Sequence, residues 1–277
     1  MELILAAILI GIVQGLTEFL PVSSSAHLTI LPPLLGWEDP LLNSASFVVM
    51  LHVGTLAALL VHFRRDLVVL AGASIAILRE RRIGEVPERR LVLLLALSVI
   101  PAAVVGALFE DVIETLFRER LVTIPVILAV GALLLWLAER VGRRDRGMTE
   151  LGARGALGIG FAQALALAPG ISRSGITIAA GLFLGLRRQD AARFAFLMGI
   201  PIIAGAGLWK AREIVATPPA PDELAALAAG MLAAAISGLI AIRTLLRYLR
   251  DHSLGIFIAY RLVAAAILLV LILATGR

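Results

Sequence analysis

Long apolar segments dominate this sequence and restrict the folds that it can adopt. A bilayer core is about 30 Å thick and a helix rises about 1.5 Å per residue, so a spanning helix needs roughly 20 apolar residues. Six segments approach that length: 43–63, 91–109, 121–139, 191–210, 223–246 and 255–274. With 60% hydrophobic residues and a mean hydropathy of +0.98, the chain lies outside the range of soluble proteins. The sequence therefore predicts an all-α, polytopic membrane protein.

Two polar stretches, 14–27 and 163–175, interrupt the apolar sequence and resemble each other. Aligned with one residue slipped, they pair Gln14 with Gln163, Leu16 with Leu165, Pro21 with Pro169 and Ser24 with Ser172. These stretches place helix breakers, hydroxyl groups, an acid, a histidine and an arginine inside apolar surroundings. Such residues are costly in a membrane and usually mark a site.

Each polar stretch breaks an apolar run that does not read as an ordinary spanning helix. The first run, 3–20, ends at Pro21. The second run, 154–168, ends at Pro169 and resumes over 175–186. We interpret each as a half-helix, a turn near mid-membrane and a second half-helix, which together form a re-entrant hairpin. The alternative is a single kinked helix that spans the membrane.

Charged segments between the apolar runs predict the topology, because cytoplasmic loops of membrane proteins are enriched in Lys and Arg. The basic loops 79–90 and 140–146 are expected in the cytoplasm, and the net acidic segments 110–120 and 213–223 outside. The segment 67–78 is too short to span, so we expect it to form a helix on the cytoplasmic side. The net charge of +5 is attributed to this topology and not to nucleic-acid binding.

This layout implies an internal repeat within a single integral membrane domain, 1–277. Repeat one, 1–140, and repeat two, 154–277, each contain one re-entrant hairpin followed by three transmembrane helices. Because three is odd, the second repeat must be inverted relative to the first, and both termini are expected outside. Inverted repeats place a site near the midplane, where their broken elements face each other. The start at Met1 has no basic n-region, so the first helix is expected to remain in the membrane.

Glu18 and Arg173 are the charges that most need an explanation. Each costs about 2.5–3.5 kcal/mol at the centre of a bilayer on insertion scales. One explanation is a functional site, and the other is a buried salt bridge between the two side chains.

Serines precede the second helix of each hairpin: Ser23, Ser24, Ser25, Ser172 and Ser174. Serine is a preferred N-cap, so capping explains at least one hydroxyl group in each hairpin. Two helix N-termini that meet in the membrane also form an anion site, to which Arg173 would add a fork suited to phosphate. Gly170 and Gly175 would let the backbone approach such a ligand closely.

His27 lies beside the serines and an acid, a combination that can activate a hydroxyl group. The other histidines lack such neighbours and are interpreted as structural or interfacial: His52, His62 and His252. Gln14 and Glu18 offer oxygen atoms suited to a hard cation such as Mg²⁺, whereas thiolate–metal sites are excluded because the chain has no cysteine. Arg261, inside the last span, either pairs with a backbone carbonyl group or extends its charge to the membrane surface.

The two stretches resemble the signatures of the undecaprenyl-pyrophosphate phosphatase family of the bacitracin-resistance type. The first signature is an acid or glutamine, three residues and a glutamate, then Leu-Pro-Val-Ser-Ser and a histidine; here it begins at Gln14 and ends at His27. The second signature, Pro-Gly-x-Ser-Arg-Ser-Gly, is matched by residues 169–175. The resemblance extends essentially from end to end of the chain.

This resemblance implies that a C55 isoprenyl diphosphate loses its terminal phosphate in the bacterial inner membrane, at a site open to the periplasmic or outer face. The reaction would regenerate the carrier lipid of peptidoglycan synthesis and give tolerance to bacitracin. The expected partners are the polyprenyl diphosphate and membrane lipids, with no nucleic acid. Whether the chain forms a homodimer is left open.

The resemblance also implies roles for individual residues. Glu18 with Gln14 would hold a divalent cation, Mg²⁺ or Ca²⁺, while Arg173 binds the diphosphate. Ser24 activated by His27 is the expected nucleophile, and His27 itself is the alternative. The supporting substrate-binding residues are expected to be Ser172, Ser25, Ser174 and Gly170. The glutamine at position 14, where many members have glutamate, would remove one charge from the metal site.

A membrane transporter or flippase for an anionic lipid is the main alternative, because inverted repeats with broken helices are typical of transporters. A serine beside a histidine and an arginine favours an enzyme over a transporter, since a transporter needs no nucleophile. An intramembrane serine protease is disfavoured, because an arginine and two helix ends suit a polyanion better than a peptide. A purely structural subunit is disfavoured by the cost of its buried charges.

Overall fold

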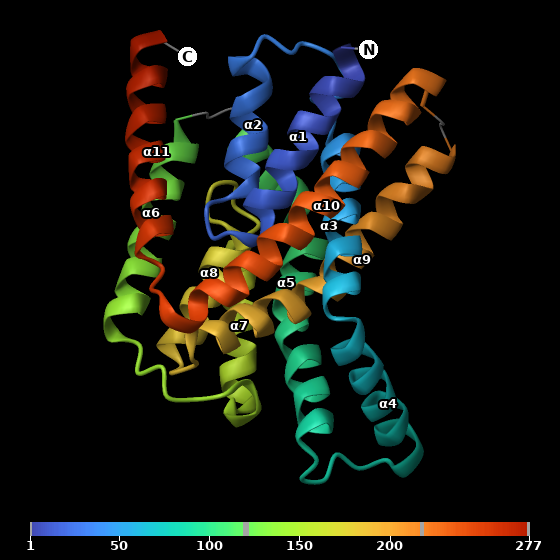
Figure 1. The fold of residues 1–277 in the computed structure, drawn as a ribbon, viewed down its shortest axis with the longest axis vertical. Coiled ribbons are helices and arrows are strands. Elements are labelled where there is room, and N and C mark those ends of the chain that lie inside the picture. The colour runs from blue at the N-terminus through green and yellow to red at the C-terminus, as the bar shows by residue number, and fades with distance from the viewer. Residues whose placement is uncertain (1, 119–121, 217–218, 276–277) are drawn as a thin grey trace.

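The computed structural model describes residues 2–118, 122–216 and 219–275, and the elements named within them are all helices (Figure 1). This confirms the all-α prediction. The elements are α1 (Glu2–Phe19), α2 (Ser24–Leu34), α3 (Ala45–His62), α4 (Arg64–Glu80), α5 (Pro87–Arg118), α6 (Thr123–Val141), the short 3₁₀ helix η1 (Met148–Glu150), α7 (Ala153–Leu165), α8 (Arg173–Phe183), α9 (Arg188–Ala216), α10 (Pro221–Asp251) and α11 (Gly255–Thr275).

Seven helices of the described chain are long and apolar enough to cross a membrane: α1, α3, α5, α6, α9, α10 and α11. Six of them coincide with the six predicted spans, which confirms a multi-pass membrane protein. The seventh, α1, matches the predicted run 3–20 to within one residue at each end and runs for 18 residues without interruption. Gln14 and Glu18 lie inside it and are buried against protein partners, so the helix need not end before them. The short helix predicted over 67–78 is α4.

The two polar stretches form helical hairpins, as predicted. α1 packs against α2, and α7 packs against α8, so the alternative of single kinked helices is wrong. In Figure 1, α1 and α2 occupy the upper half of the molecule and α7 and α8 the lower half, with the two turns near the middle. Two hydrogen bonds join the turns: the Gly170 N–H donates to Ser25 Oγ (3.1 Å), and Ser174 Oγ donates to the Leu20 carbonyl (3.2 Å).

α1 packs along α10, and glycines bring the two helices together. A Cβ atom on Gly11 would lie 2.2 Å from the carbonyl oxygen of Gly230, and one on Gly15 would lie 2.0 Å from Ser237 Oγ. Small residues let helices approach closely in a membrane, where packing supplies much of the association energy. This contact fixes the orientation of the helix that carries Gln14 and Glu18.

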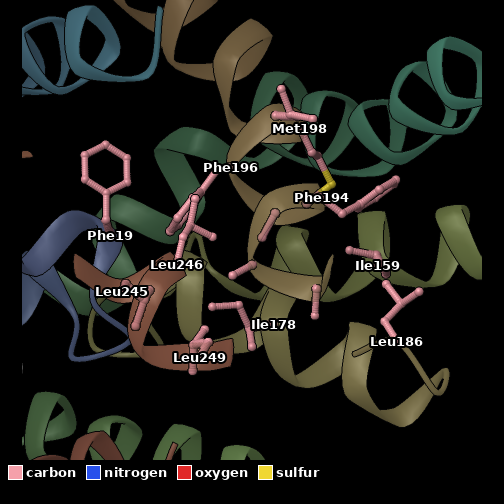
Figure 2. Close-up of a cluster of buried hydrophobic side chains, with 14 of the residues drawn as sticks. Phe19, Ile159, Ile178, Leu186, Phe194, Phe196, Met198, Leu245, Leu246 and Leu249 are labelled. Carbon is pink, nitrogen blue, oxygen red and sulfur yellow. The ribbon is translucent and has the colours of Figure 1, made fainter. Parts of the chain in front are cut away.

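A buried hydrophobic cluster supports the inner ends of the hairpins (Figure 2). Phe19, directly after Glu18, packs edge-to-face on Phe196 of α9, with ring centroids 5.3 Å apart. Ile178 of α8 and Leu245 of α10 belong to the same cluster. An aromatic pair of this geometry contributes about 0.5–1.5 kcal/mol beyond its buried area. The cluster therefore holds the end of α1 and the body of α8 in fixed positions.

The start of α1 and the end of α11 lie at the same end of the molecule, and the loop between α4 and α5 lies at the other (Figure 1). This arrangement agrees with the expectation that both termini lie on one side and the basic loop 79–90 on the other. The predicted outer segments 110–120 and 213–223 contain positions 119–120 and 217–218, which are outside the described residues. The inverted relation of the two halves and the single domain stay predictions.

Candidate active site

The inner end of α1 carries a buried carboxylate and a buried amide, one helical turn apart. Gln14 is 0% and Glu18 is 5% exposed, and Gln14 Nε2 donates to Glu18 Oε2 at 3.2 Å. The four-residue spacing places both side chains on one face of the helix. The other amide atom, Gln14 Oε1, is buried and accepts no hydrogen bond from the described part of the protein.

The second helix of each hairpin begins with the same cap. Ser23 (φ 77°) and Ser172 (φ 71°) have left-handed backbone conformations, which are rare for residues other than glycine. Each serine Oγ accepts a backbone N–H three residues later, from Ala26 at 3.5 Å and from Gly175 at 3.1 Å. The structure therefore pairs Ser23 with Ser172 and corrects the sequence alignment, which paired Ser24 with Ser172. No slipped residue is needed between the two stretches.

The first helical residues after these caps, Ser24 and Arg173, converge on Glu18. Ser24 Oγ donates to Glu18 Oε2 at 2.6 Å, and Arg173 Nη2 donates to Glu18 Oε1 at 2.7 Å. The salt bridge that the sequence leaves open between Glu18 and Arg173 is thus present, with the Glu18 side chain 4% and the Arg173 side chain 17% exposed. Buried hydrogen-bonded pairs of this kind are costly to break, because removal of one partner leaves the other charge uncompensated.

Arg173 has spare hydrogen-bonding capacity at this site. Its Nη1 is buried, and no group in the described residues accepts a hydrogen bond from it. Space for this atom comes from Gly199 of α9, where a Cβ atom would lie 2.0 Å from Nη1. A planar guanidinium group with one free edge can bind a phosphate oxygen in addition to the carboxylate.

His52 of α3 also contacts Glu18, which corrects its interpretation as a structural or interfacial residue. Its Nε2 lies 3.3 Å from Glu18 Oε2, and its Nδ1 lies 2.8 Å from the Val48 carbonyl oxygen. Both neighbours are acceptors, so this geometry favours a ring that carries a proton on each nitrogen. The sequence did contain a signal for this role. His52 lies in the middle of an apolar span, where an ionisable side chain is as unusual as Glu18 is in its own helix.

His27 does not form the predicted hydrogen bond with Ser24. Its Nδ1 lies 2.7 Å from the Ser23 carbonyl oxygen, and its Nε2 lies 2.6 Å from Tyr260 Oη. A carbonyl oxygen can only accept, so Nδ1 carries a proton, and in the neutral form of the ring Nε2 then accepts from the tyrosine hydroxyl group. The Ser24 hydroxyl group therefore donates its hydrogen bond to Glu18 and not to His27. The rings of His27 and Tyr260 are stacked, with their centroids 5.8 Å apart.

Arg261 of α11 supports the turn of the second hairpin from behind. Its side chain is fully buried, and Nη2 donates to the carbonyl oxygens of Gly170 (3.1 Å) and Ile171 (2.9 Å). Its Nε donates to the Leu128 carbonyl at 3.3 Å. Of the two possibilities from sequence, pairing with backbone carbonyl groups is the one observed. These bonds hold the turn in which Gly170 has a φ of 102°.

The predicted metal ligands have the right chemistry for a hard cation, although they are few. Within the described ranges, no group of three or more His, Cys, Asp or Glu side chains could hold a metal ion. Mg²⁺ usually binds through one or two carboxylates together with substrate phosphates, so a large protein cage is not needed. Glu18 offers a carboxylate and Gln14 a buried amide oxygen without a partner, and this donor set fits such an ion.

The match to a known family decides the affiliation of the chain. A family model described as "Bacitracin resistance protein BacA" matches residues 7–267. The chain belongs to this family. The match to the BacA family includes both hairpin turns, and it confirms the resemblance that the two signatures suggest.

Named relatives extend over nearly the whole chain. A protein from Pelobacter propionicus is 45% identical over 270 residues, which is 98% of this chain and 97% of the relative. A protein from Rubrobacter xylanophilus is 46% identical over 270 residues, covering 98% of each. A third, from Geobacter sulfurreducens, is 46% identical over 269 residues, covering 97% and 98%. All three BacA relatives are named undecaprenyl-diphosphatase.

Proposed function

We propose that this chain is an integral membrane phosphatase that hydrolyses undecaprenyl diphosphate to undecaprenyl phosphate and inorganic phosphate. The names of its relatives support this reaction. The observation that carries it is the convergence of the Ser24 hydroxyl group and the Arg173 guanidinium group on the Glu18 carboxylate. A nucleophile, a proton acceptor and a phosphate-binding cation are then within one hydrogen-bond network. The alternative of a transporter or flippase has no support from the relatives.

The chemical step assigned to this network is attack by Ser24 on the terminal phosphorus. Glu18 takes the hydroxyl proton as the Oγ–phosphorus bond forms and the bond from that phosphorus to the bridging oxygen breaks. Undecaprenyl phosphate leaves with the electron pair of the broken bond. Water then attacks the phosphoserine, releases inorganic phosphate and restores the hydroxyl group, as in other covalent catalysis by an activated nucleophile.

The charges that develop during transfer have partners ready at the two turns. Arg173 keeps Nη2 on Glu18 and has a second nitrogen, Nη1, without a hydrogen-bond partner among the described residues, which we assign to a phosphate oxygen. The N-termini of α2 and α8 present backbone N–H groups and the positive ends of two helix dipoles. Fixed donors in a site with little water stabilise a transition state more than the same groups would in solution. Ser25, Ser172, Ser174 and Gly170 line these two turns and are assigned to substrate binding.

We assign His27 a supporting role and not that of the nucleophile that attacks the phosphorus. It lies one turn after Ser24 on α2, and its Nε2 accepts a hydrogen bond from Tyr260. For His27 to act as the alternative nucleophile, that bond would have to break and the ring would have to turn. Ser24 needs no such rearrangement, because its hydroxyl group already faces a proton acceptor.

A divalent cation, Mg²⁺ or Ca²⁺, is part of the proposal, with Glu18 and Gln14 as its protein ligands. Such an ion would supply charge neutralisation for the diphosphate. The neutral amide at position 14 contributes an oxygen without a charge, so we expect a weaker requirement for the ion than with a second glutamate.

The proposed location is the bacterial inner membrane, with the site reached from the periplasmic or outer face. The positive-inside rule supports this, because the basic loop between α4 and α5 lies opposite the end where α1 begins (Figure 1). The product would return to peptidoglycan synthesis as the carrier lipid. The activity would also lower sensitivity to bacitracin.

Phosphate release from undecaprenyl diphosphate by the purified protein in detergent tests this function. We expect release by the wild-type protein, inhibition by a chelator, and loss of at least about a hundredfold in Arg173→Ala and Glu18→Gln. Arg143→Ala, which removes an arginine whose side chain is 77% exposed, is the matched control and should keep wild-type activity. No release by a well-folded wild-type protein would refute the proposal.

A further inference from the structure

A groove of about 570 Å³ lies between α2 and α11, with Leu128 of α6 among its lining residues. Ile30 and Leu31 lie on one wall, and Val263 and Ile267 lie on the other. Apart from His27 and Tyr260, every lining residue is alanine, isoleucine, leucine or valine. The groove therefore suits an apolar chain and offers a polar ligand only one point of contact.

The polar point of the groove is joined to the proposed active site. His27 and Tyr260 hydrogen-bond to each other across the groove, at 2.6 Å. His27 lies in the first turn of α2, three residues after Ser24, and these positions are neighbours on a helix surface. Because His27 lines the groove, the organic substituent of a diphosphate bound at Ser24 would reach the groove beside His27.

The groove extends away from the site along α2. Its α2 residues continue from Ala26 and His27 to Leu34, the last residue of that helix, and its α11 residues continue to Leu268. In Figure 1, the end of α2 and the end of α11 lie at the same end of the molecule. A chain that follows the groove from the site therefore moves toward the end of the molecule where α1 begins.

Several large apolar side chains on the groove are left exposed by the described part of the protein. Leu34 is 64%, Val263 59% and Ile267 54% exposed. Any membrane helix exposes such residues to lipid, so exposure alone does not identify an occupant. The link of the groove to Ser24 through His27 does, because the substrate brings an apolar chain that is covalently fixed to the group bound at Ser24.

We infer that this groove binds the first isoprene units of the substrate's polyprenyl chain; the inference rests on the proposed function. The volume is that of a pocket for a drug-sized ligand, about 300–1,000 Å³, so most of a C55 chain must remain in the surrounding lipid. Affinity should rise with chain length only until the groove is filled. Narrowing the groove one turn beyond Tyr260 should weaken binding of substrates whose chain extends past the first isoprene unit and have little effect on a single-unit chain.

The test compares a 15-carbon with a 5-carbon isoprenyl diphosphate in detergent, measured as kcat/KM for phosphate release. Ala264→Trp places a large side chain in the groove, and Ala266→Trp makes the same change at an exposed position of α11 outside it. We expect Ala264→Trp to lower kcat/KM for the longer substrate by about tenfold or more, with the shorter within about twofold. Ala266→Trp should leave both values unchanged. If Ala264→Trp does not fold, Leu31→Trp on the opposite wall replaces it.

Equal effects of Ala264→Trp on the two substrates would overturn the inference, and so would no effect on either. The second outcome would mean that the groove holds only an acyl chain of the bilayer. Failure of the wild-type protein to release phosphate from either compound and from undecaprenyl diphosphate would refute the proposed function instead. The two failures are therefore distinguishable.

Discussion

Ser24 and Arg173 occupy the same position in their two hairpins, and each binds one oxygen atom of the Glu18 carboxylate. Ser24 follows the cap Ser23, Arg173 follows the cap Ser172, and the two bonds are 2.6 Å and 2.7 Å long. The two hairpins therefore have equivalent backbones at this position but place different side chains on a single carboxylate. This difference explains how two similar hairpins can build one site with a hydroxyl group on one side and a cation on the other.

Substitution of Gly199 by alanine should displace the Arg173 guanidinium group without direct contact with the substrate. A Cβ atom there would lie 2.0 Å from Nη1 and 2.9 Å from Cζ of Arg173. We expect kcat/KM for phosphate release to fall by about ten- to a hundredfold, because displacements of about 1 Å in a site cost this much.

Gly205 of α9 provides the matched control for this substitution, because a Cβ atom at Gly205 meets nothing within 4 Å. Gly205→Ala should therefore keep full activity. Equal activities of Gly199→Ala and Gly205→Ala would show that the position of Arg173 does not limit the reaction.

Removal of the Arg261 guanidinium group should loosen the turn before α8. In Arg261→Met, the Gly170 and Ile171 carbonyl groups lose a charged donor whose hydrogen bonds are typically worth about 1.5–3 kcal/mol each. We expect a lower thermal midpoint and a lower kcat/KM, with Arg261→Lys between the wild type and Arg261→Met. A thermal unfolding scan in detergent measures this, and an unchanged midpoint in Arg261→Met would rule out the supporting role.

His52 should matter to the reaction through its contact with Glu18. His52→Leu removes a donor next to the carboxylate, whereas His52→Gln can keep an N–H group there. A lost hydrogen bond to a charged group corresponds to a decrease in rate of about ten- to a hundredfold. We expect phosphate release to fall by this factor in His52→Leu and not in His52→Gln. His62→Leu, on the same helix, is the control. The prediction fails if His52→Leu and His62→Leu release phosphate equally fast.

The spans and hairpins could be predicted because their signals are local. A segment of sufficient apolar length is expected to cross the membrane, and Pro21 and Pro169, each followed closely by serines that can cap a new helix, mark the two turns. Glu18 and Arg173 could be singled out because a charge in an apolar run is costly without a partner.

The remaining features depend on tertiary structure, which periodicity does not report. His52 acquires its partner from α1, a helix 34 residues earlier, so its sequence neighbours gave no sign of it. The ungapped alignment that pairs Gln14 with Gln163 already pairs Ser23 with Ser172, but the left-handed backbone angle that the two serines share is visible only in the structure. His27 and Ser24 are close in sequence, yet Tyr260 of α11 binds the imidazole and Glu18 binds the hydroxyl group.

Phosphate release by Ser24→Ala, measured with undecaprenyl diphosphate beside Ser74→Ala and His27→Ala, tests the central claim most directly. The account predicts a loss of at least about a thousandfold in Ser24→Ala, wild-type activity in Ser74→Ala on α4, and a smaller loss in His27→Ala. A Ser24→Ala protein that folds and releases phosphate at near the wild-type rate would contradict it.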